Sequence, residues 1–460
     1  MKKFVVYGLG ISGLATAKAL AEKGYAVIAT DDNEKSIEDS KQKFTDLQLT
    51  TYDLRLTNPD EISFDQNTII SFSPGIPLHF PTPHKILEIC KKTGAKLACD
   101  IEIFWQENQK NNFIGITGTN GKSTTTALTG FVFKELGINS QIGGNIGTPC
   151  FDLLTTHNST CIFEMSSYQL DLISNTHFRI AALLNITPDH IDRHGSIENY
   201  IAVKKRIFMN QKAGDFALID VDNKNSKHVF DELKNDKNFR ATLIPISTEK
   251  KQEGGIALID GILHNGIGDK NFSAELKSQF LRGKHNEQNM AFAFAISYCF
   301  GEQNQEKIIS AIEKFQGLRH RMQLLGEFEG IKFINDSKAT NAESTENALK
   351  SYDQIFWILG GKSKEGGIDA LVPYFKKIVK AYLIGDATED FAKILEKNSV
   401  NFEKCGDLKN AFLTALNDAK KVDGNEKNIL LSPACASFDQ WKNFEQRGDF
   451  FCQLFNDLKK

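Results

Sequence analysis

Short apolar runs alternate with amphipathic stretches from one end of the 460-residue chain to the other. Runs such as Phe4–Tyr7, Phe113–Thr117 and Gln354–Leu359 have the length and composition of buried strands, and helical patterns follow at Ser12–Lys23 and Ser123–Leu136. A strand joined through a helix to the next parallel strand is the unit of an α/β fold. The alternation therefore predicts an α/β protein with parallel sheets covered by helices. The other strands expected on this basis are Val27–Thr30, Thr68–Ser71, Thr160–Glu164, Ile180–Asn185, Phe216–Asp220, Ile256–Ile259, Ile331–Ile334, Lys380–Ile384 and Asn428–Ser432.

The length of the chain predicts several domains. At roughly 100–200 residues per domain, a chain of this size contains two to four. We place one boundary after residue 98, beyond the polar segment Thr93–Lys96, and another after residue 317, where an amphipathic helix ends. The expected domains are 1–98, 99–317 and 318–460. The most polar stretch, Asp222–Lys237, is expected to be a surface excursion of the central domain.

The composition excludes several classes of protein. Lys and Arg total 55 against 58 Asp and Glu, and this balance argues against binding nucleic acid or anionic membrane through bulk charge. The eight cysteines are never closer than nine positions, so the chain has no CxxC redox or zinc motif. No apolar run approaches the ~18 residues of a membrane span. We expect a cytoplasmic protein with buried thiols and with neither nucleic acid nor membrane as a partner.

A glycine-rich turn follows the first expected strand. Gly8–Gly13 fits the pattern GxGxxG and opens a helix, and Asp31 and Asp32 stand at the end of the next strand. This arrangement is typical of dinucleotide-binding domains, in which the acid binds a ribose. The same geometry would suit any diphosphate at a helix N-terminus, including that of a UDP-sugar. Taken alone, the motif leaves a nicotinamide-dependent oxidoreductase open.

A second glycine-rich turn, Gly118–Thr124, indicates a phosphate-binding loop. The glycines would turn backbone N–H groups toward phosphate oxygens, Lys122 would reach the β- and γ-phosphates, and the Ser123 hydroxyl would face Mg²⁺. The general pattern GxxxxGK[ST] requires glycine where Ile116 stands, so the loop is a shortened variant. A Gly-Lys-Ser-Thr sequence directly after a strand still favours nucleotide triphosphate binding over a plain turn.

Three further residues of the central region are candidates for chemistry. Glu164 ends a strand and is either a Mg²⁺ ligand or a helix N-terminal acid. His190 and His194 have the spacing of HExxH zinc sites, but Ile191 replaces the glutamate, and we reject a zinc hydrolase. Lys204 lies on the apolar side of a helical pattern, where burial would lower its pKa.

The last third of the chain repeats a pattern of strand, turn and polar residues. Gly317–Met322 carries three basic side chains at the expected boundary. Asp336–Asn341, Leu359–Lys364 and Ser432–Gly448 follow or end strands, and we expect them to converge at one sheet edge. Together they offer cations and hydroxyls suited to a small, carboxylate-rich substrate.

In combination these motifs resemble the Mur ligases, over nearly the whole chain and in order. The matching segments are Gly118–Thr124, Asn185–Arg193, Gly317–Arg321, Asn335–Asn341 and Ser432–Gly448. The resemblance implies a Rossmann-like UDP-binding domain, a central P-loop ATPase domain with a parallel sheet and a C-terminal Rossmann-like amino-acid-binding domain. It also implies an ATP- and Mg²⁺-dependent monomer that adds D-glutamate to UDP-N-acetylmuramoyl-L-alanine for peptidoglycan synthesis.

The resemblance assigns roles residue by residue. Near the uridine or diphosphate would lie Ile11, Ser12, Asp31, Asp32 and Ser73, and near the muramoyl group Asn145. ATP would be bound by Gly118, Thr119, Asn120, Gly121, Lys122, Ser123, Thr124, Asn286, Arg321 and Asp336. The Mg²⁺ ligands would be Ser123, Glu164, His190 and Lys204, the last after carbamylation. Lys338 would approach the phosphates, and D-glutamate would contact Thr340, Lys364, Ser437, Phe438 and Phe444. The catalytic set would be Lys122, Glu164, His190, Lys204 and Arg321.

Three alternatives accompany this interpretation. The nicotinamide oxidoreductase built on Gly8–Gly13 loses its basis if that turn binds UDP. A sister ligase, including folylpolyglutamate synthase, would share the phosphate loop but use another amino acid or acceptor. A nucleotide-binding regulator would bind ATP and release no phosphate with any amino acid.

Overall fold

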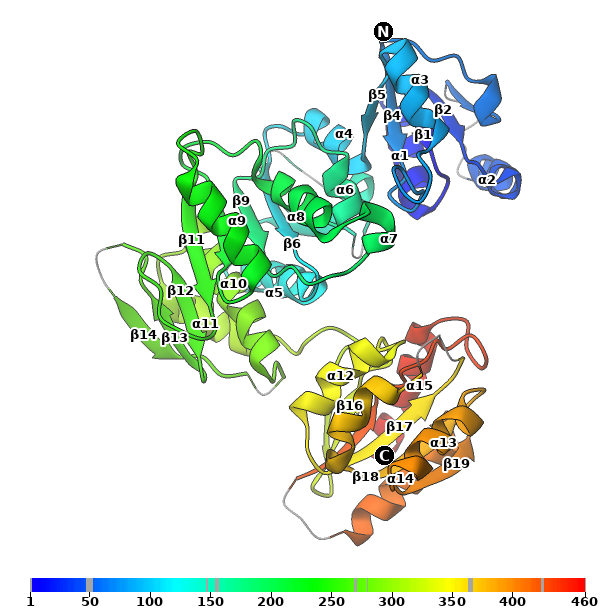
Figure 1. The fold of residues 1–460 in the computed structure, drawn as a ribbon, viewed down its shortest axis with the longest axis vertical. Coiled ribbons are helices and arrows are strands. Elements are labelled where there is room, and N and C mark those ends of the chain that lie inside the picture. The colour runs from blue at the N-terminus through cyan, green and yellow to red at the C-terminus, as the bar shows by residue number, and fades with distance from the viewer. Residues whose placement is uncertain are drawn as a thin grey trace. The chain divides into compact units, whose positions relative to one another are not determined.

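The computed structural model describes residues 2–46, 53–145, 148–153, 156, 158–268, 271–278, 280–362, 367–422 and 426–459. Three sheets alternate with helices, which confirms the α/β class (Figure 1). The chain forms two compact units, the first made of Met1–Lys277 and Lys284–Glu313 and the second of Ser278–Gly283 and Lys314–Lys460. The residue boundaries at 98 and 317 stay a prediction. Within the described ranges, no helix combines the length and the apolar character that a membrane crossing requires.

The first sheet is parallel and has five strands in the order β3-β2-β1-β4-β5. Successive strands are added on one side of β1 as far as β3 and then on its other side from β4, so the switch point lies between β1 and β4. At such a switch point, α/β sheets bind ligands at the carboxyl ends of the strands. The strands are β1 (Lys3–Tyr7), β2 (Ala26–Thr30), β3 (Leu54–Leu56), β4 (Thr68–Phe72) and β5 (Lys96–Ala98), and the helices are α1 (Ile11–Glu22), α2 (Glu34–Asp46), η2 (Pro59–Glu61) and α3 (Lys85–Thr93).

The second sheet has nine strands in the order β14-β13-β12-β11-β10-β9-β6-β8-β7 and is parallel except for the antiparallel pairs of β13. Its strands are β6 (Asn112–Thr117), β7 (Ser140–Gly144), β8 (Thr160–Glu164), β9 (Ile180–Leu183), β10 (Phe216–Asp220), β11 (Thr242–Ser247), β12 (Ile256–Ile259), β13 (Ile262–Asn265) and β14 (Phe272–Glu275). Its helices are α4 (Asp100–Glu107), α5 (Lys122–Glu135), η3 (Cys150–Asp152), α6 (Ser167–Asp171), α7 (Ile191–His194), α8 (Ile197–Lys205), η4 (Arg206–Phe208), α9 (Lys224–Asn235), α10 (Lys284–Phe300) and α11 (Gln305–Glu313).

The third sheet forms the centre of the second unit, with six strands in the order β15-β16-β20-β17-β18-β19. All neighbours are parallel except β15 and β16. The strands are β15 (Gln323–Phe328), β16 (Ile331–Asn335), β17 (Ile355–Gly360), β18 (Ile378–Ile384), β19 (Phe402–Gly406) and β20 (Lys427–Leu431). The helices are α12 (Ala342–Ser351), η5 (Asp369–Lys377), α13 (Thr388–Lys397), α14 (Leu408–Lys421) and α15 (Phe444–Asp457).

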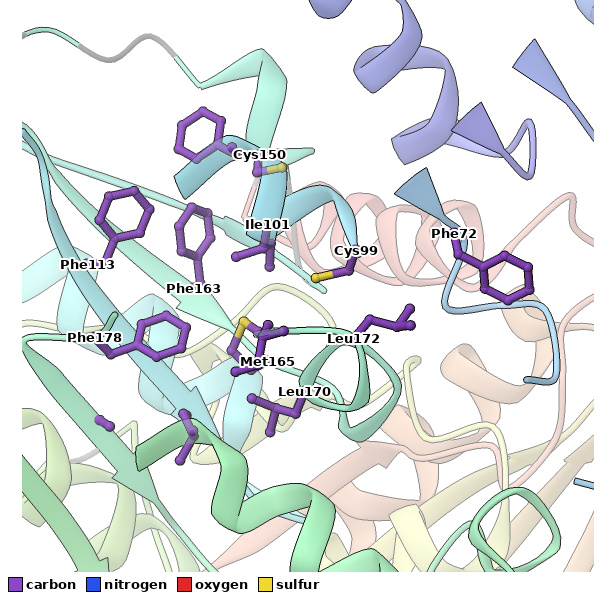
Figure 2. Packing of buried hydrophobic residues seen from close by; sticks show 14 of the residues in the cluster. Phe72, Cys99, Ile101, Phe113, Cys150, Phe163, Met165, Leu170, Leu172 and Phe178 are labelled. Carbon is purple, nitrogen blue, oxygen red and sulfur yellow. The ribbon is translucent and has the colours of Figure 1, made fainter. Parts of the chain in front are cut away.

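One hydrophobic cluster joins the first two sheets. Figure 2 shows Phe72 from β4, Ile101 from α4 and Phe113 and Phe163 from β6 and β8 in the same cluster. The strands β6 and β8 are buried almost throughout, because helices cover both faces of a parallel sheet. This shared core places the first two sheets in one compact unit.

Two expectations about local structure are wrong. The segment Asp222–Lys237 is not a surface excursion, because most of it forms helix α9. Asn223 caps this helix, and Val229 is buried on one side of it. Strand β9 ends at Leu183 rather than Asn185, because the carbonyl and side chain of Asn185 turn aside to hydrogen-bond the loop after β6. As expected, the sheets are mostly parallel; the exceptions among the described strands are the antiparallel pairs of β13 and of β15.

Candidate active site

The glycine turn after β1 lies at the switch point of the first sheet. Gly8 has a φ of 106°, and a Cβ there would stand 2.3 Å from the Cβ of Ser73 at the end of β4. A Cβ on Gly13 would stand 1.9 Å from the Gly8 carbonyl oxygen. Only glycine lets helix α1 approach the strand so closely. The turn leaves Ile11 79% exposed at the start of α1, open to a ligand.

Asp31 and Asp32, at the end of β2, are both held in place. Asp31 accepts a 2.8 Å hydrogen bond from the Leu9 N–H, which ties it to the glycine turn. Asp32 accepts from the Tyr7 hydroxyl at 2.6 Å and lies 2.9 Å from Nε2 of His84. Partial burial raises the pKa of Asp32, but these hydrogen bonds outweigh it and bring the pKa below its ordinary value. The residues expected near UDP thus gather at the ends of β1, β2 and β4.

The loop after β6 has the geometry of a phosphate cradle. Gly121, with a φ of 84°, is the N-cap of α5, so the free N–H groups of that helix end face the loop. A Cβ on Gly121 would lie 2.5 Å from the side-chain oxygen of Asn289. The Lys122 ammonium curls back over the loop and donates to the carbonyls of Gly118, at 2.9 Å, and Thr119, at 2.7 Å. The structure therefore places a cation within a ring of backbone groups.

Side chains from two other segments hold this loop. Oδ1 of Asn185 accepts from the Asn120 N–H at 2.8 Å. Oδ1 of Asn289 accepts from the Thr125 hydroxyl at 3.0 Å, while its Nδ2 donates to Asn286 at 3.0 Å. Sequence reasoning named Asn286 but missed Asn289. Its position three residues later, on the same face of α10, is the signal that could have revealed it.

Lys204, on α8, is a buried lysine beside the phosphate loop. It is 1% exposed, and its Nζ donates to the Gly118 carbonyl at 2.8 Å and lies 4.7 Å from the Tyr200 ring. Burial, together with the charge of Lys122, holds the pKa of Lys204 well below its usual range. The amine is therefore poised to react or bind as a neutral group.

Glu164 offers a buried carboxylate at the end of β8. Its Oε1 accepts from Nδ2 of Asn145 at 2.8 Å, and its Oε2 has no hydrogen-bond partner among the described residues. Such an unpartnered oxygen suits a hard cation, and Mg²⁺ often takes one protein carboxylate together with substrate phosphates and water. No group of three or more His, Cys, Asp or Glu side chains in the described ranges could hold a metal alone. The residues thus fit a magnesium ion shared with a bound phosphate.

His190 lies in an exposed turn at the start of α7. Its φ is 52°, and its Nε2 lies 3.4 Å from Oδ2 of Asp189. Its ring centroid is 5.3 Å from that of Tyr168, on which the Arg193 guanidinium also packs at 4.3 Å. Arg193 in turn donates to the carbonyls of the loop after β4. Sequence reasoning missed this contact, which connects the loop carrying His190 to the first sheet.

In the second unit, three adjacent strands have their carboxyl ends on the same side of the sheet. The strands β16, β20 and β17 are adjacent and parallel, so the turns after them lie side by side. Asp336, after β16, accepts from the Ser432 hydroxyl at 2.7 Å and from the Met322 N–H at 3.0 Å. Burial raises the pKa of Asp336 to about 7, against these hydrogen bonds and the positive charge of Arg321, which lower it.

The residues expected to hold D-glutamate surround the same edge. The Lys338 ammonium lies 5.7 Å from the Phe444 ring, and the Ser337 hydroxyl donates to the Phe444 carbonyl at 2.8 Å. Ser437 is buried, while Phe438 is 69% exposed. Thr340 is half-buried in the turn that follows β16. Lys364 lies outside the described residues.

Comparison with known proteins gives a consistent result. A family model described as Mur ligase middle domain matches residues 116–297, and one described as Mur ligase, glutamate ligase domain matches residues 320–435. A relative from Rickettsia bellii named UDP-N-acetylmuramoylalanine–D-glutamate ligase is 39% identical, over 98% of this chain and 97% of its own length. One of the same name from Caulobacter is 40% identical, over 100% and 97%.

The solved structures show the same fold. A UDP-N-acetylmuramate–alanine ligase from Thermotoga maritima superimposes with a TM-score of 0.56 at 15% sequence identity. The alignment covers 99% of this chain and 100% of that one. At this identity the likeness speaks for the fold alone.

Proposed function

The chain belongs to the Mur ligase family, and on that premise we propose that it is an ATP-dependent ligase that joins D-glutamate to UDP-N-acetylmuramoyl-L-alanine in peptidoglycan synthesis. One observation carries the choice of substrates. Relatives bearing that name match at about 40% identity along essentially the full length of both chains. The phosphate cradle after β6 and the polar turns of the third sheet supply the chemical groups that this reaction needs.

We propose that the reaction passes through an acyl phosphate. A carboxylate is a poor electrophile, so an oxygen of the L-alanyl carboxylate attacks the γ-phosphorus of ATP and the bond to the β-phosphate oxygen breaks, releasing ADP. The amine of D-glutamate then attacks the acyl carbon. The tetrahedral intermediate expels phosphate, and the nitrogen loses a proton as the amide forms. Two anions meet in the first step, so charge neutralisation is the main task of the protein.

Several residues of this chain suit that task. Lys122 and the N–H groups at the start of α5 would bind the phosphates. Arg321 and Asp336 are further candidates for ATP binding on the family resemblance. The substrate's nucleotide would lie on Ile11 and the turn after β1. Mg²⁺, held by Glu164 and the Ser123 hydroxyl with His190 as a further ligand, would neutralise phosphate charge.

We also propose that Lys204 is carbamylated. A neutral amine adds to CO₂ and loses a proton, which gives an N-carboxylate. Its burial, and the lowered pKa that results, support a neutral amine at this position. The new carboxylate would turn a buried neutral amine into an anion that could orient a metal ion.

A screen of phosphate release tests the proposal. The purified protein, ATP and UDP-N-acetylmuramoyl-L-alanine are mixed with each of a panel of amino acids, including L-glutamate and L-lysine. The assignment is supported if D-glutamate is the one amino acid of the panel that raises phosphate release above background. Release with another amino acid would show a sister ligase, and ATP binding without release would show a regulator. Binding of a reduced nicotinamide cofactor, followed by its fluorescence, would favour the oxidoreductase alternative.

A further inference from the structure

Arg447 is a buried charge that the proposed reaction does not use. It stands in the first turn of α15, three residues after Phe444, and is 1% exposed. Removing a guanidinium from water costs several kcal/mol unless other groups compensate it. No carboxylate among the described residues forms an ion pair with it; its hydrogen bonds go to a hydroxyl and to backbone carbonyls. The negative charges of Asp439 and Asp336 act on the guanidinium only from beyond ion-pair distance. A buried cation with no direct ion pair is uncommon enough to indicate a role.

The guanidinium of Arg447 touches three separate turns. Its Nε donates to the Ser337 hydroxyl at 3.0 Å, and its Nη2 donates to the carbonyls of Ser337, at 2.8 Å, and Cys435, at 3.1 Å. Its Nη1 has no hydrogen-bond partner and lies against Gly361, where a Cβ would stand 3.2 Å away. These are the turns that follow β16, β20 and β17.

Two of these turns carry described residues assigned to D-glutamate. Thr340 follows Ser337 in the turn after β16, and Ser437 and Phe438 follow Cys435 in the turn after β20. The turns also bind one another, since the Ser337 hydroxyl donates to the Phe444 carbonyl at 2.8 Å and the Lys362 N–H donates to the Ala436 carbonyl at 2.9 Å. Arg447 thus lies at the one place where all three meet.

We infer that Arg447 is a positioning residue for the D-glutamate site: it holds the three turns at a fixed separation and places a positive charge beside the turns that carry the D-glutamate candidates. The inference rests on the proposed function. Burial lowers the pKa of Arg447 to about 10, so the side chain stays charged at neutral pH. The planar fork of arginine serves the two carbonyls and the hydroxyl from two separate nitrogens in a fixed geometry, which the single nitrogen of a lysine ammonium does not reproduce.

A purely structural role would have a different signature. If Arg447 only stabilised the fold, its replacement would lower the melting temperature and the active fraction but leave the KM values of properly folded enzyme unchanged. A positioning role requires that the KM for D-glutamate rise while the KM for UDP-N-acetylmuramoyl-L-alanine stays constant. The second substrate serves as an internal reference because its expected nucleotide contacts lie in the first sheet.

The test compares Arg447→Met, Arg447→Lys and the control Phe451→Leu by steady-state kinetics and thermal melting. Methionine removes the charge and all donors, and we expect a rise in the D-glutamate KM of about tenfold or more. Lysine keeps the charge but not the fork, so its KM should be intermediate. Phe451, fully buried on the same helix, packs on Phe412 of α14 in the hydrophobic core, so its variant should melt earlier with an unchanged KM.

The outcomes separate the positioning role of Arg447 from the proposed function of the protein. An Arg447→Met enzyme with a wild-type KM for D-glutamate would overturn the inference, and so would an equal KM rise in Phe451→Leu. If the methionine variant does not fold, Arg447→Lys decides in the same way. Wild-type protein that does not consume D-glutamate at all would instead contradict the proposed function.

Discussion

At the scale of single residues, two lysines converge on one carbonyl oxygen. Lys122 and Lys204 both donate to the Gly118 carbonyl, at 2.9 and 2.8 Å. Two positive charges so close together would repel each other. Burial and this repulsion lower the pKa of Lys204, so Lys204 is the amine that becomes neutral. On the proposed function, the pair would divide two tasks, a cation that binds phosphate and an uncharged amine that is modified.

We expect Lys122→Ala to lose most of the phosphoryl transfer. Removing one preorganised group that stabilises transition-state charge typically costs ~2.7–4 kcal/mol, or about 10²–10³ in kcat. ADP release measured with saturating substrates checks this. Lys134→Ala, at the far end of the same helix, is the control and should keep the wild-type rate. Full activity of Lys122→Ala would rule out its role in the cradle.

Lys204→Ala should be inactive and partly restored by acetate or propionate. The small carboxylate would occupy the space of the proposed carbamate. Lys205→Ala is the matched control, since Lys205 pairs with Glu232 on the surface and should be dispensable. If no short acid restores activity, and the wild-type protein incorporates no labelled CO₂, the carbamylation proposal fails.

Asp336 should make the second unit less stable as the pH rises. Its pKa is about 7 in the folded protein, above the ordinary 3.8, so between these values the unfolded state loses a proton that the folded state keeps. Stability is therefore lost with rising pH up to about 7 and is constant above it. Relative to Asp336→Asn, the wild-type free energy of unfolding should fall by about 2 kcal/mol between pH 5 and 7.

Urea denaturation followed by the fluorescence of Trp357, buried in the third sheet, measures that difference. Parallel pH profiles for the two proteins would contradict the raised pKa of Asp336.

At the scale of secondary-structure elements, the site is built from strand ends and helix starts. The turns after β1, β6, β16, β17 and β20 carry the candidate residues. Within them, the glycines allow positive φ angles or close approach, and polar side chains from other elements hold the backbone. Gly121 shows both effects, because its φ is 84° and Asn289 fills the space beside it.

We expect Gly121→Ala to raise the KM for ATP severalfold or more. The new Cβ would meet Oδ1 of Asn289 at 2.5 Å, which forces the cradle or α10 to shift. Gly137→Ala, at the other end of α5, is the matched control: its φ is also positive, at 72°, but nothing lies within 4 Å of the added Cβ. Equal effects of the two substitutions on ATP binding, measured by calorimetry, would show that backbone strain alone matters.

Strand prediction from the sequence failed in a systematic way. In the described part of the chain, every edge strand went unpredicted, whereas most interior strands were anticipated. The unpredicted edges are β3, β5, β7, β14, β15 and β19, and the unpredicted interior strands are β11 and β13. Edge strands here are half-exposed, so their sequences lack the apolar run that marks a strand buried on both faces.

Side-chain contacts between distant segments were equally hidden. The motifs revealed Lys122, Glu164 and Asp336, because a charged residue at a strand end is visible in the sequence. The motifs did not reveal the hydrogen bonds of Asn289 and Arg447 to these turns, because such contacts depend on which helix packs beside which turn. Local spacing carries no information about such contacts.

At the scale of the whole molecule, the alternation of apolar runs and amphipathic stretches was enough to predict the α/β class, while the division into three domains stays a prediction. The path of the chain between units was not predictable. Ser278–Gly283 belongs to the second unit although first-unit residues flank it on both sides. Arg282 anchors this segment there, with its guanidinium 3.0 Å from Glu426 and 5.9 Å from the Tyr352 ring.

The central claim is that ATP activates the substrate's carboxylate before the amine of D-glutamate attacks it. Isotope transfer tests this most directly: UDP-N-acetylmuramoyl-L-alanine labelled with ¹⁸O in its carboxylate is turned over with D-glutamate, and the released phosphate is analysed by mass spectrometry. We predict one ¹⁸O atom in the phosphate for every amide bond formed. Amide formation with unlabelled phosphate would contradict the acyl-phosphate route, and the absence of amide would contradict the function itself.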